Sequence, residues 1–187
     1  MKISYIEQQD KEVMPYFKKE KGYTNKYMMP RINKIIVNCG IGKLVTSDNY
    51  SKDDIVNTIS ESIALITGQK PKVCKAKKSI AGFKLREGMP VGLAVTLRGK
   101  TMVNFYDKLV NVVIPRTRDF WGFNRKNFDT NGNLSIGVKE LSAFLEIDTD
   151  RIKIPFSLQI CFNVKGKDKE DAVKMFELLK FPLSKVK

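Results

Sequence analysis

The strongest candidate for chemistry in this sequence is a cluster of cations in the segment KAKKSIAGFKLREGMP, residues 75–90. Glu87 is its only acidic residue, and Gly82, Gly88 and Pro90 are typical of a projecting hairpin loop. Phe83 adds an aromatic face that can pack on a sugar or a base. Runs of lysine are usually only solvated, but the turn residues and the ring favour RNA contact here. We therefore predict a basic loop, residues 75–88, whose cations are Lys75, Lys77, Lys78, Lys84 and Arg86.

A second group of cations surrounds three aromatic residues between positions 116 and 126. Phe120, Trp121 and Phe123 belong to the class of side chains that either fill a core or stack on nucleic-acid bases. For Trp121 the sequence leaves both roles open. The cations of this second cluster are Arg116, Arg118, Arg125 and Lys126.

The motif GIGK, residues 40–43, invites comparison with a phosphate-binding loop. A Walker loop has four residues between its glycines and has Ser or Thr directly after its lysine. Here a single residue separates the two glycines, and Leu44 follows the lysine. We favour a tight turn that glycine permits, with nucleotide-dependent phosphotransfer as the alternative.

The segment FDTNGNLSIGVKE, residues 128–140, imitates a calcium-binding loop. Side chains with oxygen atoms stand at positions one, three, five, seven and twelve of an EF-hand register, and they are Asp129, Asn131, Asn133, Ser135 and Glu140. The sixth position, where glycine makes the sharp turn, is Leu134. An Asn-Gly turn at 131–132 explains the same residues, so we favour a turn and predict no metal or other cofactor.

The overall composition limits the classes of partner and of chemistry. The 187 residues include 34 Lys and Arg against 20 Asp and Glu, so the formal net charge is +14 and a polyanion is the expected partner. Nucleic acid is favoured over an anionic membrane surface. Histidine is absent, which excludes Ser-His-Asp and Cys-His catalysis, and we predict a protein that is not an enzyme. The three cysteines, Cys39, Cys74 and Cys161, are widely spaced and are predicted to be free buried thiols.

The spacing of apolar residues predicts the elements that position these side chains. Helices are predicted at 53–67, 101–113 and 168–180, where apolar residues recur on one face. Ser51 and Asp54 have the spacing of a capping box for the first helix, and Pro115 should end the second. Pro15 should interrupt a helix at 7–21. Strands are predicted at 34–39, 72–75, 91–98 and 156–164.

The last of these strands alternates most clearly between apolar and polar residues. Its apolar side is formed by Phe156, Leu158, Ile160, Phe162 and Val164. This pattern is typical of a sheet that helices cover on one face and that is open on the other. We predict a single α+β domain over residues 1–187. The amino terminus is too polar for a signal peptide and the apolar runs are too short to span a bilayer, so no membrane partner is expected.

Five segments resemble, in order and spacing, those of the bacterial-type large-subunit ribosomal protein five family, which binds 5S rRNA. They are PRINKIIVNCGIG (30–42), TGQKPKVCKAKKSIAGFKLREGMPVGLAVTLRG (67–99), PRTRDFWGF (115–123), FDTNGNLSIG (128–137) and FPLSK (181–185). The resemblance implies a mainly antiparallel five-stranded sheet with helices packed on one face. It also implies a monomer within the central protuberance of the large ribosomal subunit. The ribosome would be cytoplasmic, although the sequence equally fits an organellar one.

The resemblance also implies which residues bind 5S rRNA. Asn38, Gln69 and Thr96 match positions that the family uses for hydrogen bonds to this RNA. Uncharged donors and acceptors suit this task, because they discriminate shape and edges whereas lysines only add attraction. The cations that would add this attraction are Arg31, Lys70, Lys72 and Arg98.

In the family, the loop that matches the basic loop reaches peptidyl-site tRNA. The implied contact residues are Lys75, Lys77, Lys78, Ser79, Phe83, Lys84 and Arg86. A loop that binds phosphates holds any tRNA regardless of its sequence. The family also contacts large-subunit rRNA and a protein of the small-subunit head. Loops within 116–146 are expected to make that bridge, and the four cations of the second cluster are candidates for inter-subunit or rRNA contacts.

The sequence departs from the family pattern in three places. Trp121 stands where relatives commonly have arginine, so a phosphate contact there is not expected. Thr130 and Asn131 replace a Gly-Arg pair and remove one more cation. The segment 146–155 is shorter than usual, so its bridge contacts are expected to differ.

Overall fold

The computed structural model describes residues 4–47, 51–118, 120–147, 154–166 and 168–184. Within them a five-stranded, mainly antiparallel sheet has the strand order β2-β3-β1-β5-β4. The strands are β1 (Arg31–Gly40), β2 (Lys72–Lys75), β3 (Pro90–Leu97), β4 (Leu134–Val138) and β5 (Leu158–Lys165). The predicted α+β fold with an open antiparallel sheet is confirmed. Most of the departing segment 146–155 lies outside the described residues.

Burial alternates along the strands, as expected for a sheet that is covered on one face and open on the other. In β5 and just before it, all five residues of the predicted apolar side are buried, whereas Gln159 is exposed. β4 was not predicted from the sequence. Its alternation is equally regular, since Leu134, Ile136 and Val138 are buried and the two residues between them are exposed. The strand is short and follows a turn-rich segment, so its pattern is weak in the sequence alone.

The helices stand before, between and after these strands. They are α1 (Tyr5–Gln8), α2 (Met14–Lys21), α3 (Gly42–Thr46), α4 (Lys52–Thr67), α5 (Gly99–Lys108), α6 (Ile114–Arg116) and α7 (Lys169–Leu178). Ser51 is the N-cap residue of α4, as predicted, but its side chain makes no capping hydrogen bond. The capping-box prediction is therefore wrong, and the physical reason is that Ser51 and Asp54 are exposed, so water can satisfy the first N–H groups.

Two prolines lie within helical runs. Pro15 does not interrupt its helix as predicted, because α2 continues to Lys21, whereas Pro115 stands one residue before the run ends at Arg116, close to the predicted end. A π-helical turn at Gln9–Val13 joins α1 to α2, and a second one at Leu109–Val113 joins α5 to α6. Pro15 and Pro115 each follow such a turn and stand in the first turn of the next helix. A π turn is wider than an α turn, so the carbonyl that would clash with the proline ring is displaced. Because the hydrogen-bond register changes there, no carbonyl is left without the N–H donor that proline lacks.

The chain forms two compact units. Unit 1 comprises residues 1–35, 97–136 and 161–187, and unit 2 comprises residues 36–96 and 137–160. Four strands contribute residues to both units, and β2 belongs to unit 2 alone.

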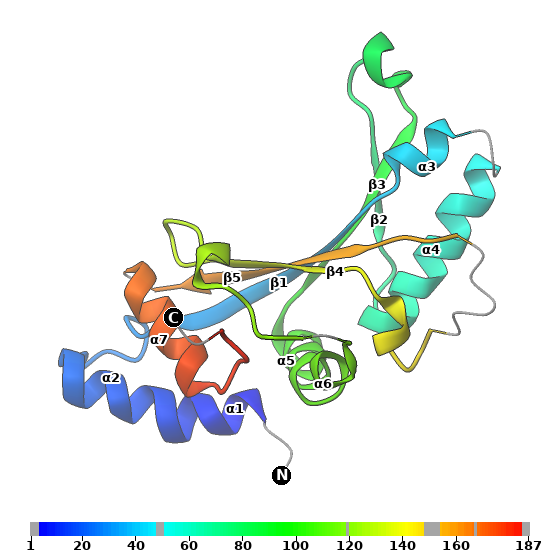
Figure 1. Cartoon of the computed structure of the whole chain (residues 1–187). Coiled ribbons are helices and arrows are strands. Elements are labelled where there is room, and N and C mark those ends of the chain that lie inside the picture. Colours follow the sequence, from blue (N-terminus) through cyan, green and yellow to red (C-terminus); the bar gives the residue numbers. More distant parts are fainter. Residues whose placement is uncertain (1–3, 48–50, 119, 148–153, 167, 185–187) are drawn as a thin grey trace. The chain divides into compact units, whose positions relative to one another are not determined.

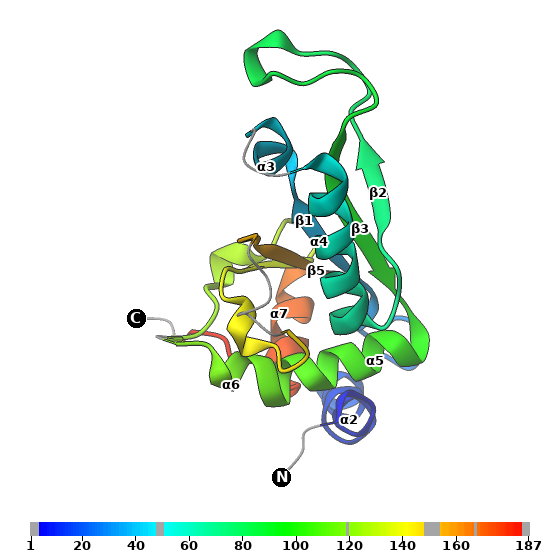
Figure 2. The same ribbon diagram turned by 90° about the vertical axis from the view of Figure 1, so that its right-hand side faces the viewer.

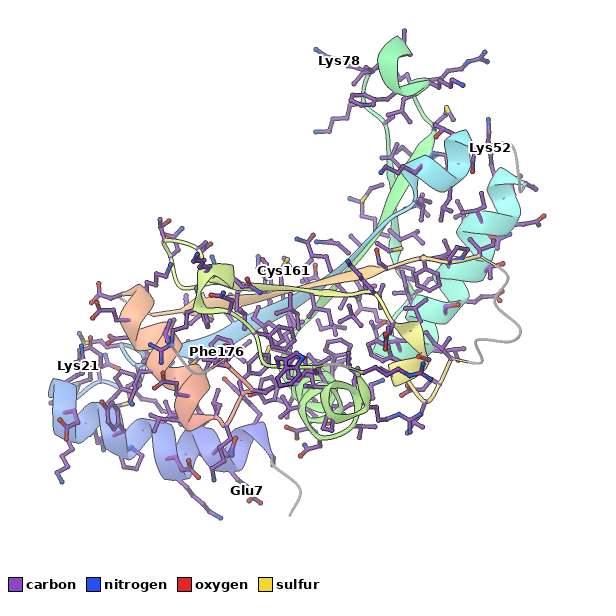
Figure 3. The ribbon with its side chains drawn as sticks, viewed as in Figure 1. Glu7, Lys21, Lys52, Lys78, Cys161 and Phe176 are labelled. Carbon is purple, nitrogen blue, oxygen red and sulfur yellow. The ribbon has the colours of Figure 1, made fainter. Side chains whose placement is uncertain are left out.

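Aromatic rings dominate the core of unit 1. Phe162 of β5 contacts Tyr106, Phe176 and Phe181 with ring centroids 6.2, 5.8 and 5.6 Å apart. Phe176 points from α7 toward the sheet (Figure 3). Near the end of α2, buried Asp171 pairs with Lys21 at 3.2 Å and accepts a 2.8 Å hydrogen bond from the Tyr23 hydroxyl. Helix α7 is thus held by the packing of its Phe176 ring and by the ion pair of its Asp171.

Branched aliphatic residues form much of the core of unit 2. Helix α4 lies along β2 and β3 (Figures 1 and 2). Four isoleucines of α4 are buried, at positions 55, 59, 63 and 66. Leu93 and Val95 of β3 are buried as well. Because the helix covers one side of these strands, the side chains that alternate with the buried ones form an open surface.

Candidate nucleic-acid interface

The basic loop connects β2 to β3 and has a well-defined hairpin geometry. At its base, the Ala76 N–H donates to Met89 O at 2.8 Å and the Gly88 N–H donates to Ala76 O at 3.0 Å. Near its tip, Ile80 and Leu85 form an antiparallel bridge with hydrogen bonds of 3.0 and 3.1 Å. In Figure 1 the loop extends beyond α3 and away from the rest of unit 2. The backbone therefore presents the loop as a projecting structure.

The tip of the basic loop is a single tight turn. Ala81–Phe83 form a 3₁₀ turn, and Lys84 follows with a φ of 52°, in the left-handed region that lysine seldom adopts. The Ser79 hydroxyl accepts a 3.0 Å hydrogen bond from the Glu87 N–H and so joins the two arms. Ser79, which we predicted to contact tRNA, therefore also has a structural role.

The predicted cations of the basic loop are all exposed. Lys78 points outward from the tip in Figure 3. Phe83 is 71% exposed, so its ring has no place in the core. Five long cationic side chains and one accessible ring on a projecting loop can bind phosphates and a sugar or base without selecting a sequence.

A second surface of unit 2 lies on the uncovered side of β1, β2 and β3. Asn38 stands between buried Val37 and Cys39, and Thr96 stands between buried Val95 and Leu97, so both face away from the core. Strands β1 and β3 are neighbours in the sheet. Lys72 is paired with Ala94, whose alternation with Leu93 and Val95 places it on the same side. We call this surface the open face, and its residues are Ile36, Asn38, Gly40, Lys72, Cys74, Gly92, Ala94 and Thr96.

The open face is flat and has no acidic residue. The strand segments 36–40, 72–75 and 90–96 contain neither Asp nor Glu. Side chains project little from this face at Gly40, Gly92 and Ala94. At Gly92 there is little room for a larger residue, because a Cβ atom would lie 3.2 Å from the carbonyl oxygen of Cys39. The small residues were not singled out from the sequence, because only the strand pairing shows that they share one face. A flat surface with sparse donors, acceptors and one lysine suits the edge or backbone of a folded polyanion.

The other predicted 5S rRNA-binding residues lie in both units. Gln69 and Lys70 are exposed in unit 2, directly after α4. Their turn is held by Thr67, whose hydroxyl donates to Gln69 O at 2.9 Å. Arg31 and Arg98 belong to unit 1. The Arg31 guanidinium lies 5.0 Å from the centre of the Tyr27 ring, a contact that no local sequence signal indicated.

The second cluster lies in unit 1 and its cations differ in their environment. Arg125 pairs with the Glu177 carboxylate, and Lys174 contacts the same carboxylate at 3.1 Å. Arg116, Arg118 and Lys126 are exposed. Arg125 is therefore partly neutralised within the fold, which reduces its attraction for a polyanion.

The two alternative sites do not gain support from the geometry. The Ile41 N–H of the GIGK motif donates to Val91 O at 3.1 Å, so the motif joins the sheet instead of cradling a phosphate. Asp129 accepts hydrogen bonds from the Asn131 and Asn133 N–H groups at 2.9 and 2.7 Å. Desolvation raises the pKa of Asp129, but hydrogen bonds from Asn133 and Asn131 and the Lys169 charge outweigh it and lower the pKa overall. Within the described residues no group of three His, Cys, Asp or Glu side chains is arranged to hold a metal ion.

The three cysteines are free thiols, but only Cys39 is buried. Burial raises the pKa of Cys39 to about 12, so this thiol is not a nucleophile near neutral pH. Cys74 and Cys161 are half-buried, against the prediction. Cys161 alternates with buried Ile160 and Phe162, and Cys74 lies on the open face. In the part of the chain that the structure describes, no helix has the length and apolar character needed to cross a membrane.

Comparisons with known proteins identify the family. The profile described as "Ribosomal protein L5" matches residues 25–86, and the profile for the C-terminus of the same ribosomal family matches residues 90–183. "Large ribosomal subunit protein uL5" of Thermosipho africanus is 42% identical over 98% of each chain. The protein of the same name from Kosmotoga olearia is 43% identical over 96% of this chain and 95% of its own. The spinach protein "Large ribosomal subunit protein uL5c" is 42% identical over 97% of this chain and 67% of its own. The chain therefore belongs to the ribosomal protein L5 family.

Proposed function

We propose that this chain, a structural constituent of the large ribosomal subunit, binds 5S rRNA in the central protuberance through the open face of unit 2. The L5 family is a family of structural ribosomal proteins and not of enzymes. The observation that carries the proposal is the arrangement of Asn38, Thr96 and Lys72 on one flat, acid-free side of three strands. Gln69, Lys70, Arg31 and Arg98 extend this contact set in the proposal.

Within the open face, the uncharged residues supply selectivity and the cations supply attraction. A hydrogen bond that is shielded from water on binding discriminates between RNA shapes, since a mismatched partner leaves a polar group unpaired. Lys72 and the other cations release counterions from any RNA alike. We therefore expect selective binding that weakens with salt but survives at physiological ionic strength.

A second part of the proposal assigns the basic loop to peptidyl-site tRNA. Its five exposed cations and the exposed ring of Phe83 support a contact with backbone phosphates that ignores base sequence. A ribosome must accept every tRNA, and such a contact meets that requirement.

A third part assigns the second cluster to large-subunit rRNA or to a protein of the small-subunit head. The exposed side chains of Arg116, Arg118 and Lys126 support this assignment. We also propose that the whole chain acts as one RNA-binding domain and as a monomer in the ribosome. This is supported by the four strands that contribute residues to both units.

The experiment that tests the central proposal is a binding titration of the full chain against 5S rRNA and against a structured control RNA of similar length. Both titrations run from low to physiological salt. We expect the preference for 5S rRNA to persist as salt rises, since hydrogen bonds on the open face depend little on counterions. Equal binding to both RNAs, with the two affinities falling together, would contradict specific recognition and leave only a basic surface.

A further inference from the structure

The segment Phe120–Phe123 presents the chain's one tryptophan to solvent. Trp121 is 88% exposed, whereas Phe120 and Phe123 on either side are half-buried. Trp is the largest side chain and is normally well buried, so this exposure needs a structural explanation. The role of a core residue, which the sequence left open, is excluded.

The aromatic residues around Trp121 are packed against the end of the chain. The Phe120 and Phe123 rings contact each other with centroids 4.8 Å apart, and the Phe123 ring stacks on Phe181 at 5.5 Å. The Phe123 N–H donates to Pro182 O and the Ser184 N–H donates to Phe123 O, both at 2.9 Å. The neighbours of Trp121 are therefore fixed while its own side chain is left outside.

Gly122, which follows Trp121, adopts a backbone conformation that favours glycine. Its φ is +98°, a value that side chains other than glycine rarely tolerate. A Cβ atom built there would lie 2.8 Å from the backbone nitrogen of Ser184, and a backbone atom cannot move aside cheaply. The backbone next to Trp121 is thus fixed by its close approach to Ser184 while the indole stays exposed, which is typical of a preorganised contact.

The charge around Trp121 indicates what covers it. Arg116 and Arg118 lie within five residues of it along the chain, and both are exposed, as is Lys126. Phosphates complement these cations, and every nucleic-acid base has a flat face that stacks on an indole. A protein partner would instead need acidic groups around an apolar pocket.

From these observations we propose that Trp121 is a stacking platform for an unpaired RNA base, with Arg116 and Arg118 binding the adjoining phosphates. This inference deepens the proposed function and rests on it, since both require the chain to meet RNA. The contact is separate in sequence from the open face and the basic loop, and it reads an exposed base instead of a duplex edge.

A fluorescence titration tests this inference, because the protein has a single Trp and its emission reports this position alone. The full chain is titrated with a single-stranded oligoribonucleotide of roughly ten nucleotides and with a duplex of the same length. We expect saturable quenching by the single strand and little quenching by the duplex, even where the duplex binds through its phosphates. Equal quenching by both would overturn the stacking role and leave only charge attraction, and no quenching by either would overturn base contact altogether.

Variants separate stacking from charge. Affinities for a labelled single strand are measured by anisotropy, because the variants lack the indole. Trp121→Phe and Trp121→Tyr should retain affinity within about twofold, and Trp121→Ala should lose about tenfold, as expected for one stacked base. Trp121→Arg should bind with a steeper salt dependence and without preference for unpaired RNA. Folding should be unaffected, since the side chain is almost wholly exposed. Equal affinity of the Phe and Ala variants would overturn the proposal.

Leu65→Ala provides a matched control, because Leu65 is also a large apolar side chain exposed to solvent and has no part in the proposed RNA contacts. It should leave the quenching of Trp121 unchanged.

The inference and the proposed function fail differently. Loss of 5S rRNA selectivity with intact single-strand quenching would contradict the proposed function alone. Acrylamide, which quenches exposed tryptophan, separates the other case. If selectivity for 5S rRNA is intact but Trp121 is protected from acrylamide only by a ribosomal protein and never by RNA, the inference alone is contradicted.

Discussion

The basic loop joins β2 to β3, and the open face lies on these two strands and β1, yet the two surfaces expose different chemistry. The loop carries its cations on exposed residues of a projecting hairpin, and its acidic content is one glutamate. The open face carries Asn38, Thr96 and a single lysine, with Gly40, Gly92 and Ala94 among the residues between them. The basic loop is rich in charge and poor in donors held at fixed positions. The open face has little charge and has polar side chains at positions that the sheet fixes.

This difference teaches how neighbouring strands of one sheet, and the loop that joins two of them, can serve two kinds of recognition. Lysines at the end of a projecting loop gain Coulomb attraction from any phosphate but fix little geometry. Short side chains on a strand have few rotamers and a position set by the sheet, so they can test the shape of a partner. Salt dependence is therefore the property that should separate the two surfaces.

The largest expected effect comes from removing the charge of the basic loop. A variant with Lys77→Ala, Lys78→Ala, Lys84→Ala and Arg86→Ala should bind tRNA about 100-fold more weakly at low salt. Its logarithmic salt slope should fall by about one for each cation. Filter binding of tRNA and of 5S rRNA over a salt series measures both, and 5S rRNA affinity should stay nearly constant.

A matched control removes four exposed lysines elsewhere, Lys18, Lys19, Lys100 and Lys139, and so has the same net charge. It should retain tRNA binding better than the loop variant does. A loop variant that lost 5S rRNA while holding tRNA normally would reverse the division of labour proposed for the two surfaces.

The next largest effect is expected from the open face. Asn38→Ala should weaken 5S rRNA binding by about 1–3 kcal/mol, because it leaves a polar group of the RNA unpaired in the contact. The salt slope should not change, since no charge is removed. Asn104→Ala on the exposed side of α5 is the control and should have no effect. A change in salt slope without a change in selectivity would argue against a role for Asn38 in shape recognition.

Converting the open face toward the chemistry of the loop should have a smaller effect of a different kind. Thr96→Lys adds one cation and removes one hydroxyl, so it should raise the salt slope by about one for 5S rRNA and for the control RNA alike. The preference for 5S rRNA should shrink about fivefold. The two binding titrations proposed for the wild type measure this ratio, and an increased preference would show that charge, not shape, sets selectivity on this surface.

The smallest expected effect concerns the shape of the basic loop. Ser79→Ala removes the hydroxyl that accepts from the Glu87 N–H and joins the two arms of the hairpin. Because both groups are exposed, water replaces the bond, and tRNA affinity should fall by only about twofold. Ser142→Ala, at another exposed serine, is the control. A loss as large as that of the charge variant would mean that Ser79 itself binds tRNA in preference to holding the loop.

Much of the fold was predictable because local patterns and burial agree. Apolar residues at helical spacing predicted α4, α5 and α7, and strict alternation predicted the buried side of β5. The basic loop was also visible, since its cations, glycines and proline are consecutive in the sequence. The family followed from motifs spread over nearly the whole chain, and both profile matches confirm it.

Other features depend on contacts between residues far apart in the sequence. Pro15 and Pro115 remain within helical runs because π turns precede them, and no local propensity announces such a turn. Arg125 is paired with Glu177, 52 residues away, and so its charge is partly neutralised. The flatness of the open face arises only when strand pairing brings Gly92 and Ala94 beside Asn38 and Lys72.

By itself, then, the sequence determined the charge, the periodicity of the helices and strands, the position of the basic loop and the family. The tertiary structure alone decided that Trp121 lies in solvent while the phenylalanines beside it are packed, and that Ser79 joins the two arms of the loop. The physical reason is that charge and periodicity belong to consecutive residues. Exposure and hydrogen bonding depend on what the folded chain brings against each side chain, as Ser184 does at Gly122.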